Sequence, residues 1–249
     1  YVKYLKQFVE GMLQNKNLDD TTVNHLKIQL QDHKLFSLNN NSEALQENIK
    51  KIDGKIIIPA LMELDEKAEQ VVKNTVRDTM IAVIMSPFKS LDSIVILSQN
   101  GKMFLDLVKL YNQHPGMIQT FRFAKDVMMI ITSVNILNYT ERLTEKLMRN
   151  IPILNRTTDD VIQGIGVGIL TTSVGKAAIN RCRAFYVWNA DAEKSNFLKA
   201  SAKFGGHVRG IFVEDVLPSL GTLWVEAWKK VRSAIDKTLG LTQTVADYS

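Results

Sequence analysis

Glycine recurs in an apolar run, Gln163-Gly-Ile-Gly-Val-Gly-Ile, and Gly175-Lys176 follows further on. This is the part of the sequence that most resembles a phosphate-binding loop. Glycine-rich turns can bind phosphate because their backbone N–H groups come close to the ligand. A dinucleotide site would need glycine at position 169, which is Ile. A P-loop would need glycine at 170 and Ser or Thr at 177, which are Leu and Ala. The sequence therefore predicts no nucleotide site here.

On a helix the same residues have a different use. Gly164, Gly168, Thr172 and Gly175 fall on one side, and small residues spaced in this way let two helix backbones approach closely. Each interior glycine costs about 1 kcal/mol relative to alanine, so the run implies a compensating contact. We predict that these four residues form a helix-contact seam. Close packing in a soluble bundle and packing of membrane-associated helices both fit.

Cys182 stands between Arg181 and Arg183, and neighbouring positive charge can lower a thiol pKa and activate it. A lone cysteine more often serves as a small buried hydrophobe, and we favour that interpretation. With a single cysteine the chain has no intrachain disulfide.

Other catalytic patterns are missing from the sequence. The histidines do not have the spacing of a helical metal site, and there is no nucleophile elbow. We expect no cofactor, no metal and no enzymatic activity. An enzyme would at least need titratable groups such as Arg122, Asp126, Arg181 and Arg183 to converge in a pocket.

Composition and charge restrict the class further. The chain has 249 residues, 45% of them hydrophobic and 23% charged, which suits a folded domain. Its net charge of +5 is concentrated in residues 79–156, with 9 basic and 5 acidic residues, among the most apolar segments. Such a region suits an anionic membrane or an acidic partner, although a solvated face is also open. Without a basic cluster interleaved with aromatics we expect no nucleic-acid binding.

Helical periodicity dominates, and no strand alternation is convincing, so the sequence predicts an all-α, multi-helix bundle with long antiparallel helices. We expect helices at 57–86, at 88–111, at 117–149, from about 159 onwards and at 207–239. Ser86-Pro87 should end the first of these, and Gly205-Gly206 should separate the last from a short polar helix.

These helices divide into three predicted parts. Residues 1–56 form an N-terminal helical extension, residues 57–190 a helical core, and residues 191–249 a C-terminal amphipathic region packed on the core. No segment reaches the roughly 18 uninterrupted apolar residues of a membrane span.

The final predicted helix carries a tryptophan-bearing apolar stripe beside basic residues, which suits a membrane interface or a partner groove as well as a core face. Its candidate membrane or partner surface is Trp224, Trp228, Lys229, Lys230 and Arg232. Phe121-Arg-Phe123 with Lys125 invites the same interpretation.

The run Gln163-Gly-Ile-Gly-Val-Gly-Ile-Leu-Thr171, then Val174-Gly175 and Cys182-Arg183, resembles the signature of the YcjF-like family. Upstream, Ser86-Pro87 and Pro115-Gly116 agree in order, and the resemblance covers about residues 68–183. Ala184-Phe185 and Ser173 depart from the family pattern. The family comprises uncharacterised bacterial inner-membrane proteins, and a related domain is appended to GTPases. The resemblance implies a helical, membrane-linked protein beside a P-loop GTPase, and supplies no active site.

Together these observations predict a non-enzymatic, membrane-associated regulatory or scaffolding domain. Its expected partners are an anionic membrane surface and a protein, which the family resemblance implies to be a GTPase. The sequence leaves open whether the domain forms a homo-oligomer. We expect a soluble fragment or peripheral part at the cytoplasmic face of the bacterial inner membrane. The alternative is a lipid or apolar-ligand module, with a closed cavity lined by Met80, Ile84, Met128 and Met129.

Overall fold

The computed structural model describes residues 9–31, 47, 50–52, 54, 57–86, 89–111, 116–133, 140, 142, 144–145, 159–183, 190–201 and 203–221. Over these residues the chain is helical without strands, so the all-α prediction is confirmed. The elements are α2 (Asp20–Gln31), α4 (Ile58–Met85), α5 (Lys89–Tyr111), α6 (Met117–Ser133), α8 (Asp159–Arg183), α9 (Ala190–Ser201), α10 (Phe204–Ile211) and the π-helical turn η3 (Phe212–Val216). The predicted division into three parts stays a prediction.

Local sequence signals set several helix ends. Ser86 adopts an extended conformation that ends α4, as expected for the residue before a proline. Pro59 lies in the first turn of α4, where a missing N–H costs nothing. Asp159 and Asp160 open α8, where carboxylates complement the positive end of the helix dipole.

Two features of the C-terminal part differ from the predictions or were not predicted. Gly205 and Gly206 do not separate two helices, because both lie in the first turn of α10. Gly205 is buried, so tertiary packing holds a segment that has low helix propensity. Downstream, the N–H of Leu217 bonds the carbonyl of Phe212, five residues back. Pro218 explains this wider turn, since its ring would clash with the carbonyl of Glu214 in a regular α-helix.

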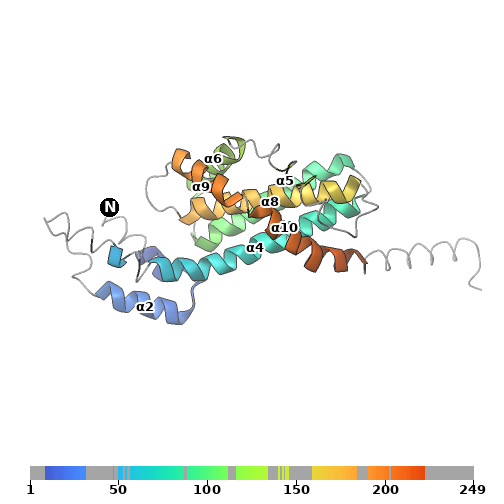
Figure 1. The fold of residues 1–249 in the computed structure, drawn as a ribbon. Helices are drawn as coiled ribbons and strands as arrows, with labels where there is room; N and C mark the ends of the chain where they lie inside the picture. The colour runs from blue at the N-terminus through green and yellow to red at the C-terminus, as the bar shows by residue number, and fades with distance from the viewer. Residues whose placement is uncertain are drawn as a thin grey trace, which may run out of the picture.

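Helix α8 is the centre of the bundle, and α4, α5, α6 and α10 all pack against it (Figure 1). Position 164 of α8 lies against Ile84 of α4, and Gly175 lies against Val72, so these two helices are antiparallel. Since α5 returns from the end of α4, α5 and α8 run parallel. Helices α6 and α9 lie side by side at the end of the bundle where α8 finishes.

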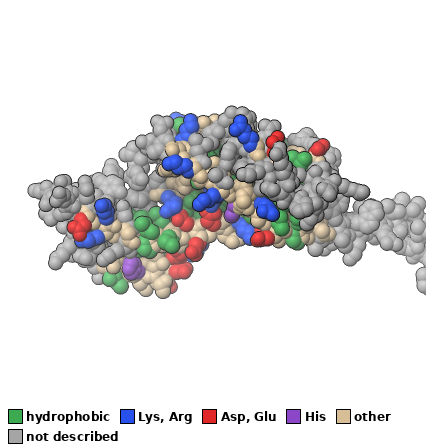
Figure 2. All heavy atoms as spheres, in the orientation of Figure 1, with side chains coloured by type: hydrophobic (Ala, Val, Ile, Leu, Met, Phe, Trp, Pro, Cys, Tyr) green, Lys and Arg blue, Asp and Glu red, His purple; other side chains and the backbone are tan. Residues whose placement is uncertain are grey.

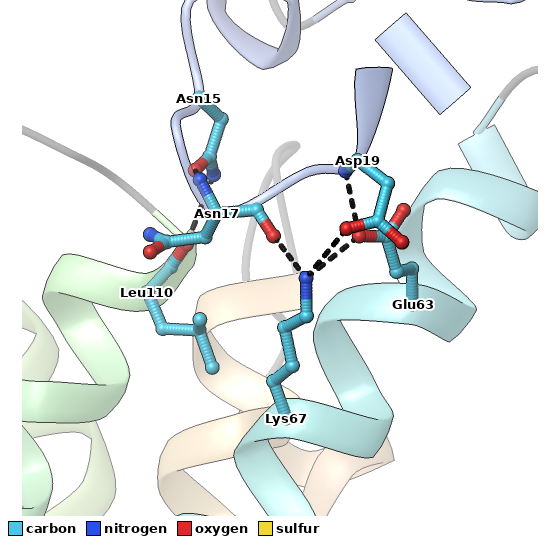
Figure 3. A network of polar contacts seen from close by, with 6 residues as sticks. All are labelled: Asn15, Asn17, Asp19, Glu63, Lys67 and Leu110. Carbon is cyan, nitrogen blue, oxygen red and sulfur yellow. Dashed lines mark hydrogen bonds and ion pairs between the residues drawn. The ribbon is translucent and has the colours of Figure 1, made fainter. Parts of the chain in front are cut away.

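The segment before α2 is attached to the core by the polar network of Figure 3. Asn15 Nδ2 donates to the carbonyl of Leu110 at 2.9 Å, and Asn17 Nδ2 donates to the same carbonyl at 3.2 Å. Lys67 Nζ bonds the carbonyl of Asn17 and pairs with Glu63 at 2.8 Å. The asparagines thus bond carbonyls at the end of α5 that have no partner within the helix. This contact positions α2 beside the beginning of α4.

Candidate functional site

The glycines of α8 lie at its contact with α4. A Cβ at Gly164 would lie 2.5 Å from Ile84 Cγ1, and one at Gly175 would lie 2.6 Å from Val72 Cγ2. A Cβ at Gly168 would meet Met80 Sδ at 2.6 Å and Val208 Cγ1 at 3.2 Å, so α10 closes over the same place. At each of these three positions a neighbouring side chain would have to shift before a Cβ could be accommodated.

The other two small residues of the run are placed differently. Thr172 is buried, and its hydroxyl donates to the carbonyl of Gly168 within α8. Gly166 points away from α4, where a Cβ would meet Thr144 Oγ1 at an ordinary 3.7 Å. The side of α8 that faces α4 therefore requires glycine, whereas the side that faces Thr140 and Thr144 has room for a methyl group.

Polar side chains link α8 to α5 at two levels. Gln163 Nε2 donates to Asp92 Oδ2 at 3.0 Å, and two helical turns further Asn100 Nδ2 donates to Thr171 Oγ1 at 3.2 Å. Asp92 is 3% exposed and Asn100 is buried. Such buried hydrogen bonds fix the register of the two helices, because slipping them would leave the groups without partners.

Ion pairs gather in the second half of α8. Arg181 pairs with Asp126 of α6 at 2.5 Å, and its guanidinium carbon lies 4.1 Å from the centre of the Phe123 ring. Arg183 pairs instead with Asp65 of α4 at 3.5 Å. The four groups that an enzyme would have needed therefore do not converge: Arg122 is exposed on α6, and Arg181 and Arg183 pair with different helices.

A second ionic group joins α4, α8, α10 and η3. Lys176 pairs with Glu69 at 2.5 Å, and Lys73 pairs with Asp215 at 3.0 Å. His207 lies among them, and burial together with the positive charge of Lys176 lowers its pKa. The face bearing α4 and α10 accordingly shows basic and acidic side chains intermixed (Figure 2).

Near Arg183, the Tyr111 hydroxyl donates to Asp65 Oδ1, and burial and this carboxylate raise the pKa of Tyr111. Cys182 is a buried free thiol, and burial raises its pKa to about 12. The interpretation of Cys182 as a buried hydrophobe is confirmed, and an activated thiolate is wrong.

The most unusual surface lies on α5 and α6. Most of the large hydrophobic side chains that the described residues expose are on these two helices: Ile94, Leu97, Leu105, Met117, Ile118, Phe121, Met128 and Met129. The exposed charged side chains described there are all basic: Lys102, Lys109, Arg122 and Lys125. The acids of both helices, Asp92, Asp106 and Asp126, are buried or half-buried. We call these eight apolar and four basic residues the α5–α6 surface.

The closed apolar cavity that would have favoured the alternative ligand module is not formed by its four candidate residues. Met80 and Ile84 are buried against the glycines of α8, whereas Met128 and Met129 are exposed. In the described part of the chain, groups of three or more His, Cys, Asp or Glu residues that could hold a metal are also lacking. The C-terminal candidate surface, Trp224, Trp228, Lys229, Lys230 and Arg232, lies outside the described residues.

Comparison with known proteins now identifies the family. Residues 50–202, more than half of the chain, match the family described as Domain of unknown function (DUF697). The chain belongs to this family. DUF697 is the domain associated with YcjF-like proteins, so the resemblance seen in the sequence is confirmed. The match includes α4, α5, α6, α8 and α9.

Curated bacterial relatives of this DUF697 protein share the name "UPF0283 membrane protein". One from Rhizobium johnstonii is 23% identical over 60% of this chain and 44% of its own length. One from Histophilus somni is 25% identical over 57% of this chain and 38% of its own length. This chain therefore spans less than half the length of these relatives. No solved structure matches it.

Among the described residues, one helix of the DUF697 protein, α8, is long and apolar enough to cross a membrane by length and composition alone. However, 67% of its most apolar window is buried within the fold. That burial is typical of the core helix of a bundle.

Proposed function

We propose that this domain is a non-enzymatic, membrane-associated regulatory or scaffolding module that lies on anionic lipid through the α5–α6 surface. The observation that carries the proposal is the charge of this surface: among the described residues, the exposed charged side chains that accompany its exposed apolar ones are all basic. Exposed apolar residues in such numbers mark an interaction site, and the absence of exposed acid among them favours a negatively charged partner.

The rest of the molecule supports this orientation. The α4–α10 face mixes both signs of charge, and several of its charged groups are neutralised in ion pairs, which weakens its attraction to anionic lipid (Figure 2). Each base held near an anionic membrane contributes about 1 kcal/mol, so four bases would bind appreciably even before apolar contacts form. The name of the curated relatives, membrane protein, agrees with this role. We place the domain at the cytoplasmic face of the bacterial inner membrane, where anionic lipid is available.

Flotation of the purified chain with vesicles tests the proposal. We expect binding to vesicles that contain phosphatidylglycerol, little binding to phosphatidylcholine alone, and weaker binding as salt screens the bases. Equal binding to both compositions, or none to either, would contradict it.

For the regulatory role we propose a P-loop GTPase as partner, supported by the YcjF-like resemblance. Purification of the tagged protein from native membranes, followed by identification of bound proteins, tests this step. Repeated recovery without any GTPase would remove that partner and leave the lipid proposal intact.

A further inference from the structure

Helix α6 is apolar on two opposite faces. Its inner face fills the core with Phe123, Val127, Ile130 and Ile131. Its outer face exposes Met117 at 91%, with Ile118 and Phe121 both at 74%, and continues one to three turns later with Met128 and Met129. A helix that is apolar all round is normally covered on every side. Among the described residues, the side chains on the inner half of α6 are buried and those on its outer half are exposed.

The inner contacts fix which half faces outward. The ion pair between Asp126 and Arg181 and the position of that guanidinium over Phe123 hold α6 in one rotation about its axis. They also turn the helix's only acid toward the core. Arg122 and Lys125 are left exposed among the outer apolar residues, so the exposed charged groups of α6 are both basic.

We propose that α6 is the element that enters the lipid, lying in the plane of an anionic bilayer with Phe121 and Met117 among the acyl chains. Arg122 and Lys125 then reach the phosphates of the headgroups, as basic side chains of interfacial helices do. This inference rests on the proposed function and narrows it. Helix α5 contributes attraction through Lys102 and Lys109 but stays outside the acyl region.

The choice of α6 over α5 follows from the two outer faces. On α5 the exposed large apolar side chains are Ile94, Leu97 and Leu105, with Gly101 on the stripe between them. On α6 the outer apolar residues include an aromatic ring and three methionines, whose flexible side chains adapt to an irregular surface. Lipid is favoured over an acidic protein because the curated relatives are named membrane proteins and the bases lie within the apolar face, matching a layer of phosphates above acyl chains.

The test compares three matched pairs of substitutions in the full chain by flotation on phosphatidylglycerol vesicles. Met117→Ser with Phe121→Ser removes the α6 anchors, and Ile94→Ser with Leu97→Ser removes two exposed residues of α5. Ile58→Ser with Met62→Ser serves as control, because both are exposed apolar residues of α4, outside the α5–α6 surface. We expect the α6 pair to bind at least about tenfold more weakly, the α5 pair to lose clearly less affinity, and the α4 control to bind as wild type. An equal loss for the α5 pair would overturn the choice of α6.

A fluorescent reporter gives a second measurement. A nitrobenzoxadiazole label on Phe121→Cys should shift to shorter wavelength with vesicles, whereas the same label on Met62→Cys should not. Labelling is selective because Cys182 is buried. Circular dichroism of each variant verifies that the fold is intact.

The possible results separate the two proposals. If wild type binds and the α6 pair binds equally well, the α6 inference is wrong and the proposed function stands. If wild type fails to bind anionic vesicles, both are wrong. If the label at position 121 shifts with protein concentration in the absence of lipid, a second copy of the chain covers α6, and this too overturns the inference.

Discussion

The contact between α8 and α4 gives the sharpest test of the fold. Whether a single added methyl group clashes there decides whether a Gly→Ala substitution raises or lowers the free energy of unfolding. In Gly175→Ala the new Cβ would lie 2.6 Å and 2.8 Å from the two methyl carbons of Val72. Val72 is fully buried and β-branched, so it cannot turn aside without losing its preferred rotamer. One of the two helices must shift.

The magnitude follows from two opposing effects. Replacing an interior helical glycine with alanine gains about 1 kcal/mol of helix propensity. Overpacking a filled core costs about 1–3 kcal/mol, and the rigid neighbour places this site near the upper part of that range. We therefore expect Gly175→Ala to lower the free energy of unfolding by about 1–2 kcal/mol.

Gly166→Ala is the matched control on the same helix. Its Cβ would lie 3.7 Å from Thr144 and 3.8 Å from Thr140, an ordinary contact. It keeps the propensity gain without the clash, so it should raise stability by about 0.5–1 kcal/mol. Opposite signs for two Gly→Ala changes in one helix can only come from tertiary packing.

Urea unfolding followed by far-ultraviolet circular dichroism measures both variants. The double variant Val72→Ala with Gly175→Ala should recover part of the loss relative to the sum of the single changes, since it vacates the space that the new methyl group needs. Stabilisation by Gly175→Ala equal to that by Gly166→Ala would refute the packing argument. Leucine at Gly164 or Gly168 should destabilise by several kcal/mol for the same reason.

Three further outcomes are expected. Asp126→Asn should lower the free energy of unfolding by about 2 kcal/mol, because it leaves Arg181 with a weaker acceptor in a mostly buried position; an unchanged urea midpoint would contradict this. The lowered pKa of His207 means that the folded state binds its proton less readily than the unfolded state does, so stability should be full above the ordinary histidine pKa and fall as pH decreases through the folded value. His207→Gln should flatten that part of the pH profile, and an identical profile in both proteins would count against it. Asn15→Ala should reduce hydrogen-exchange protection in α2 at a cost of about 1 kcal/mol without affecting α8, whereas equal loss in both helices would show that the network supports the whole fold.

The fold class and most of the helices could be predicted from the amino-acid sequence. Helical periodicity and the proline after Ser86 marked the ends of α4 and α5, since these signals act within a few residues. The missing glycine at position 170 and the missing hydroxyl at 177 excluded a P-loop without any coordinates. The prediction that Gly205-Gly206 would separate two helices was wrong, because helix propensity is a weak preference that burial can override.

Which face of each helix is covered, and by which neighbour, could be learned from the three-dimensional structure alone. The spacing of the α8 glycines could not say whether Ile84, Met80 and Val72 or a membrane neighbour would lie against them, because periodicity defines a face but not its occupant. Likewise, α6 reads as an ordinary apolar helix until one half is seen to be covered and the other left open with Arg122 and Lys125. Exposure depends on the packing of segments far apart in the chain, and no local pattern contains that information.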